Sequence, residues 1–121
     1  MKKVTILIFL TFTSVVLAQK STKDLLQGKW QSVEDKNNIL WFSGNLRKET
    51  ADRKTWDSEE FKLSSKCENE SDIESVGNSV KSNFISCKES DMCWEIESVT
   101  STTLNLIYTA RGNTLTYKRI K

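Results

Sequence analysis

A succession of short strand-like segments, separated by tight-turn signals, constrains this fold more than any other feature. The segments are apolar or alternate apolar with polar residues, and polar turn residues or glycines separate most of them. One helical turn is expected within residues 20–27, with Ser21 or Thr22 as its N-cap. The pattern predicts an all-β fold, an eight-stranded antiparallel up-and-down meander. The expected strands are residues 30–34, 39–42, 46–52, 59–63, 82–87, 93–97, 104–108 and 114–120.

Alternation also assigns faces within the later strands. Trp94 and Ile96 share one face of their strand, and Glu95 lies on the other. Tyr117 and Arg119 share a face of the last strand. A β-sandwich produces the same pattern as a closed barrel, so alternation alone does not choose between them.

The N-terminus has the pattern of a short, bacterial-type secretory signal peptide. A basic start is followed by an apolar run over residues 4–17 and by Ala18 at a small-residue cleavage site. The run is too short for a transmembrane anchor. The residue after the cleavage site is Gln19, where a bacterial lipoprotein would carry cysteine. We therefore expect removal of residues 1–18. Residues 19–121 should then form one domain in the periplasm or outside the cell, without stable membrane insertion.

Charge argues against a nucleic-acid partner. The chain has 18 Lys and Arg against 16 Asp and Glu, and the excess disappears with Lys2 and Lys3 of the leader. Acidic residues are concentrated in residues 57–97, whereas residues 98–121 carry bases and no acid. A mixed solvated surface explains this distribution most simply, and faces of opposite sign on a barrel are the alternative.

Three residues carry a family resemblance. Gly28 and Trp30 open the first expected strand, and Arg119 lies near the end of the last one. This arrangement resembles the lipocalin (calycin) family. The resemblance implies a barrel in which Trp30 plugs one end and Arg119 lies across it. A buried tryptophan at the start of another small β-domain would give the same local motif.

The resemblance also implies a non-enzymatic binding protein, and we expect it to hold a small hydrophobic molecule. Small periplasmic barrels of related shape inhibit proteases or lysozymes. An exported inhibitor, or a module that binds an unidentified protein through its surface loops, is therefore the alternative. We expect the protein to be a monomer.

The three cysteines, Cys67, Cys87 and Cys93, all follow the predicted leader, in a compartment where oxidation is the default. An odd number allows one internal disulfide and leaves one thiol. Cys87 and Cys93 flank a turn and can face each other across a hairpin. A bond from Cys67 to either partner is favoured, because it would attach the polar, acidic residues 64–81 to the sheet.

The chain contains no histidine. Catalysis by Ser-His-Asp or Cys-His groups and zinc sites built on histidine are thereby excluded. We expect no enzymatic activity, no metal site and no cofactor.

Aromatic residues are the candidate ligand-binding side chains. An eight-stranded barrel has room inside for side chains or for one small ligand. Trp30 is assigned to core packing, while Trp41 and Trp94 suit core packing and cavity lining equally well. Trp41, Trp94 and Tyr117 are the predicted lining of an apolar cavity.

Overall fold

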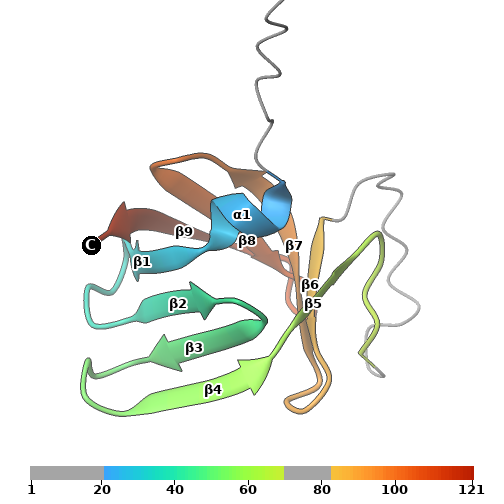
Figure 1. The fold of residues 1–121 in the computed structure, drawn as a ribbon, viewed down its shortest axis with the longest axis horizontal. Coiled ribbons are helices and arrows are strands. Elements are labelled where there is room, and N and C mark those ends of the chain that lie inside the picture. Colours follow the sequence, from blue (N-terminus) through green and yellow to red (C-terminus); the bar gives the residue numbers. More distant parts are fainter. Residues whose placement is uncertain (1–20, 70–82) are drawn as a thin grey trace, which may run out of the picture.

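The computed structural model describes residues 21–69 and 83–121. They form an antiparallel, nearly closed β-barrel with one short helix (Figure 1). Residues 1–20, which include the predicted leader, lie outside the described residues, and so do residues 70–82, which include most of the polar stretch 64–81. The elements are α1 (Thr22–Leu26), β1 (Gly28–Ser32), β2 (Ile39–Ser43), β3 (Leu46–Thr50), β4 (Trp56–Glu60), β5 (Lys62–Ser64), β6 (Phe84–Cys87), β7 (Met92–Val99), β8 (Thr103–Tyr108) and β9 (Asn113–Ile120).

The strands make one sheet in the order β4-β3-β2-β1-β9-β8-β7-β6-β5. The first and last strands are paired, with Trp30 opposite Arg119. The two edges of the sheet are therefore β4 and β5, which are consecutive in the chain and separated by Phe61 alone. β4 pairs with β3 and β5 pairs with β6. Residues 56–64 thus act as one bent strand that joins the two edges and nearly closes the barrel.

This bend explains why nine strands are observed where the sequence predicted eight. A single strand was expected over residues 59–63, whereas the structure begins it at Trp56 and divides it at Phe61. The Phe61 side chain turns into the core and packs edge-to-face on Phe42, with ring centroids 5.3 Å apart. Its backbone N–H still donates to Asn45 O, so the pairing with the β2–β3 turn continues through the bend.

The predicted faces of β7 are confirmed. Trp94 and Ile96 lie in the main core, and Cys93 belongs to a second buried cluster with Cys67 and Phe84 on the other side of the sheet. The other predicted strands are present with ends shifted by a few residues. The register between β7 and β8 shifts between Ile96 and Ser98, an irregularity that alternation does not reveal.

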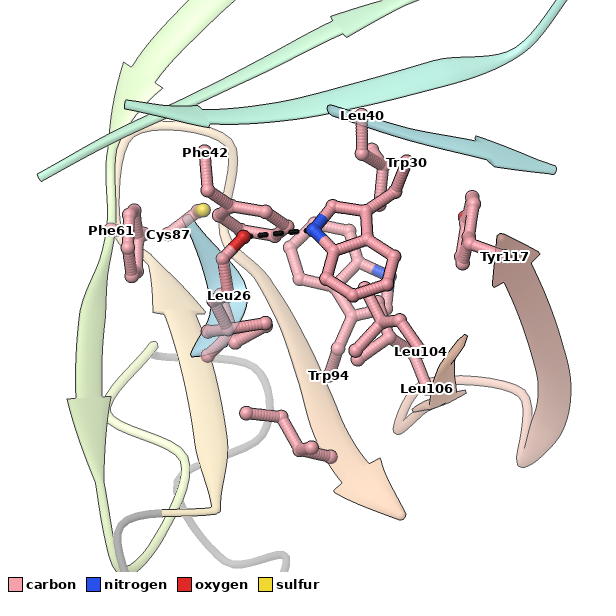
Figure 2. Packing of buried hydrophobic residues seen from close by; sticks show 12 residues of the cluster. Leu26, Trp30, Leu40, Phe42, Phe61, Cys87, Trp94, Leu104, Leu106 and Tyr117 are labelled. Carbon is pink, nitrogen blue, oxygen red and sulfur yellow. Dashed lines mark hydrogen bonds between the residues drawn. The ribbon is translucent and has the colours of Figure 1, made fainter. Parts of the chain in front are cut away.

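The core fills the barrel beneath α1. Ser21 caps the helix, because its hydroxyl accepts a hydrogen bond from the Asp24 backbone N–H at 3.2 Å. α1 lies across the top of the barrel in Figure 1 and inserts Leu26 into the interior. The Trp30 indole Nε1–H donates to Leu26 O at 2.8 Å, which satisfies a polar group that would otherwise be buried unpaired (Figure 2). No helix within the described part of the chain is long and apolar enough to span a membrane.

Candidate functional site

Gly28, Trp30 and Arg119 form one end of the barrel. The guanidinium carbon of Arg119 lies 4.1 Å from the centroid of the Trp30 ring. Arg119 also donates to the backbone oxygens of Leu25 and Gln27 at 2.6 Å each. Trp30 is fully buried, so its stack with Arg119 packs this end of the barrel as part of the structure.

The three predicted ligand-binding residues do not line one cavity. Trp94 and Tyr117 are almost fully buried and pack with the apolar side chains of the interior (Figure 2). Trp41 lies on the outer face of β2, between the inward residues Leu40 and Phe42. It packs edge-to-face on Trp56, with ring centroids 5.9 Å apart. An apolar site shared by Trp41, Trp94 and Tyr117 is therefore not formed.

Polar side chains of β3 point into the barrel instead. Arg47 is only 5% exposed, whereas its neighbour Leu46 is 37% exposed. The Arg47 guanidinium carbon lies 3.9 Å from the centroid of the Trp94 ring, and Nη2 lies 3.5 Å from Glu49 Oε1. Among the described residues, the buried Arg47 Nε has no hydrogen-bond partner. The register forces this inversion, because Arg47 stands opposite the inward Phe42 of β2.

These inward side chains reach an open pocket of about 350 Å³. Its lining comes from β3, β4, the β6–β7 turn and the start of β7. Figure 1 shows how the ribbons of these elements run beside the β4 and β5 edges of the sheet. Its lining holds four carboxylates, one guanidinium, two hydroxyls and one thioether. The lining residues are Arg47, Glu49, Asp57, Ser58, Glu59, Glu89, Ser90 and Met92. We call this the seam pocket.

The carboxylates of the seam pocket fall into two groups. Glu49 pairs with Arg47 and accepts from Asn38 Nδ2 at 3.0 Å. Glu59 bridges the seam, since it accepts from both the backbone N–H of Ser90 at 3.1 Å and its hydroxyl at 2.7 Å. Asp57 and Glu89 are exposed and take part in neither of the two ion pairs found in the described residues. They are free to neutralise a positive charge that enters the pocket.

Burial changes the acidity of two groups near Arg47. It raises the pKa of the Cys87 thiol to about 12, although the Arg47 charge opposes the shift. It likewise raises the pKa of Tyr117 to about 12, and the Glu49 carboxylate adds to the effect. Both groups are therefore neutral near pH 7, and Cys87 is no nucleophile there.

The disulfide joins Cys67 to Cys93, and Cys87 is the free, buried thiol. The expectation that Cys67 is bonded is confirmed, and the alternative Cys87–Cys93 pairing is not formed. The Cys67 side of the bridge is further held by Glu68 N–H, which donates to Ser86 Oγ at 2.9 Å. On the far side of the undescribed residues, Asn83 O accepts from Ile96 N–H at 2.6 Å.

Sequence reasoning missed Arg47, Asp57, Glu59 and Glu89 as pocket residues. One signal was available, because strand β3 carries Arg47 and Glu49 two positions apart and hence on the same face. That spacing cannot tell which face is inside. The pairing of Glu59 with Ser90 spans 31 residues and depends on the bend at Phe61, so nothing local in the sequence indicates it.

Comparison with models of protein families, with curated proteins and with solved structures found no match to this chain. The barrel and its Trp–Arg closure therefore stand on the structure alone.

Proposed function

We propose that this protein is an exported, non-enzymatic binding protein of the lipocalin (calycin) type, and that the seam pocket holds a small cationic molecule with an apolar part. One observation carries the proposal: four carboxylates line a pocket in which the one cation among the described residues, Arg47, is already paired with Glu49 and stacked on Trp94. A cleaved leader that ends at Ala18 would take the protein out of the cytoplasm.

The ligand chemistry follows from the lining. Like charges converging on one pocket attract an ion of opposite sign, and within the described part of the chain Asp57 and Glu89 form no ion pair. Met92 offers an apolar, adaptable contact at the same pocket. A pocket of about 350 Å³ is at the lower end of the size range for small-molecule sites. An amine or quaternary ammonium compound with one aromatic or aliphatic group meets all these requirements.

Dyes of opposite charge test the proposal. Auramine O is an apolar cation that fluoresces when immobilised, and anilinonaphthalene sulfonate is an apolar anion of similar size. We expect auramine O to bind saturably at one site per chain, and the anion to bind at least ten times more weakly. Because the pocket is open to solvent, binding of the cation should weaken with added salt.

A matched pair of double variants locates the site. Asp57→Asn with Glu89→Gln removes the two unpaired pocket charges. It should weaken auramine O binding about tenfold, at roughly 0.5–1 kcal/mol for each solvent-exposed charge contact. Glu95→Gln with Glu97→Gln removes two carboxylates that lie outside the pocket lining and should leave the affinity unchanged. Tighter binding of the anionic dye, or equal effects of the two double variants, would refute the proposal.

The inhibitor alternative is retained for one reason. Residues 70–82 connect two anchored points on β7, the Cys93 disulfide and the Asn83–Ile96 hydrogen bond. The alternative proposes that the acidic sequence between these two anchors, which includes Glu70 and Asp72, contacts a protein. If Glu70→Gln with Asp72→Asn abolished capture of a protein from host extract while dye binding stayed intact, the alternative would replace the small-molecule proposal.

A further inference from the structure

The large hydrophobic side chains exposed to solvent all lie on one face of the sheet. Among the described residues they are Val33, Leu46 and Trp56. Leu46 and Trp56 lie on β3 and β4, on the face opposite the inward Arg47. Val33 follows β1, and its N–H continues the pairing with β9 by donating to Thr116 O at 3.0 Å. All three therefore project from the outer surface formed by β9, β1, β2, β3 and β4.

Lysines stand between these apolar side chains in register. Lys29 of β1, Trp41 of β2 and Lys48 of β3 are directly opposite one another, so they project on the same face. The two ammonium groups lie 4.6 Å and 4.2 Å from the centroid of the Trp41 ring. Lys118 stands opposite Gln31 on the same outer surface. The ring thus holds two cations at fixed positions beside an aromatic pair.

The pleat separates the charges of these five strands. Glu49, Asp57 and Glu59 project toward the seam pocket, and Glu60 beside Leu46 is the carboxylate left on the outer surface of these strands. Neither ion pair of the described residues includes Lys29, Lys48 or Lys118. We call this outer surface, with Val33, Leu46, Trp41, Trp56 and the three lysines, the lysine–tryptophan face.

We propose that the lysine–tryptophan face binds peripherally to an anionic lipid bilayer. The outside of a closed sheet is convex and cannot enclose a small molecule, whereas it can rest on a planar surface. Tryptophan is the residue that partitions into the headgroup region, and lysine keeps its ammonium group among anionic headgroups while its stem covers apolar surface. Attraction of unpaired lysines to such a surface is worth about fivefold in affinity for each residue. This surface is separate from the seam pocket, so either proposal can fail without the other.

Vesicle flotation tests the inference. The protein is expressed with its own leader, recovered after processing, and checked by mass for an N-terminus at Gln19. It is mixed at low salt with vesicles of equal phosphatidylglycerol and phosphatidylcholine, or of phosphatidylcholine alone. We expect flotation with the anionic vesicles only, a blue shift of tryptophan fluorescence, and release at high salt.

Two double variants identify the face. Lys29→Gln with Lys48→Gln should weaken binding to the anionic vesicles about 25-fold, from about fivefold per lysine. Lys66→Gln with Arg111→Gln removes the same charge from exposed positions after β5 and in the β8–β9 turn, and should change binding less than threefold. Equal losses in the two variants, flotation with neutral vesicles, or no flotation at low salt would overturn the inference. Binding of dextran sulfate without binding of vesicles would also overturn it, in favour of a soluble polyanion.

Discussion

The Arg119 guanidinium covers the Trp30 ring at 4.1 Å and at the same time donates to backbone oxygens of Leu25, Gln27 and Ser101. One side chain from the last strand therefore ties together the helix, the start of the first strand and the turn before β8. These contacts reinforce the ladder between β1 and β9.

Replacing Arg119 by alanine should destabilise the protein strongly. The loss of the cation–π contact and of charged hydrogen bonds should lower the free energy of unfolding by about 2–4 kcal/mol. Arg111→Ala, in the β8–β9 turn, should change it by less than about 0.5 kcal/mol. Urea unfolding followed by tryptophan fluorescence measures both. Equal losses of unfolding free energy in the two variants would show that Arg119 does not close this end of the barrel.

Gly28 is required by the same contact. Its φ is +114°, and a Cβ at this position would lie 2.6 Å from Arg119 Nη1. Gly112 also has a positive φ, of +69°, but a Cβ there meets nothing within 4 Å. Gly28→Ala should therefore destabilise more than Gly112→Ala, which should cost about 1 kcal/mol. Part of the stability lost in Gly28→Ala should be regained when Arg119 is also replaced by alanine, because Arg119 Nη1 then no longer crowds the new Cβ.

The parts of the fold that follow from local pattern could be predicted from the sequence. Alternation placed Trp94 and Ile96 inside. The contact between Trp30 and Arg119 did not follow from local pattern and was implied only by the lipocalin resemblance of Gly28, Trp30 and Arg119. The seam pocket could not be predicted, because hydropathy alone would bury Leu46 and expose Arg47. The pairing of Arg47 with the inward Phe42 on β2 instead places Arg47 inside the barrel and Leu46 outside. Strand register is a tertiary property, and it overrides the preference of a single side chain.

Thiol chemistry gives a direct check of the interior. Cys87 is fully buried with a raised pKa, so iodoacetamide at pH 8 should leave the native, unreduced protein unmodified. In denaturant without reductant, peptide mapping should find one modified cysteine, Cys87. Modification of Cys67 or Cys93 under those conditions would contradict the disulfide assignment.

Stability should decline at alkaline pH. The pKa of Cys87 rises from 9.0 to about 12 on folding, and that of Tyr117 from 10.0 to about 12. As the pH rises above about 9, the unfolded chain loses these protons first, so deprotonation favours unfolding. The contribution is fully present below pH 9 and is lost progressively towards pH 12. In urea unfolding between pH 8 and 10.5, Tyr117→Phe should show a shallower decline than the unmodified protein. An identical decline would show that the phenol is not buried as described.

The most direct test of the central claim is to map where a cationic ligand binds, by recording ¹H–¹⁵N NMR spectra during titration with auramine O. Ser90 and Met92 line the seam pocket, and the Trp94 ring, whose indole N–H gives a separate signal, stacks on the pocket residue Arg47. We expect these signals to move together and to saturate at one equivalent, while the Trp30 indole, bound to Leu26 O, stays in place. Saturable shifts confined to the Trp41 and Trp56 indoles, with Ser90 and Met92 unchanged, would contradict the seam pocket as the ligand site.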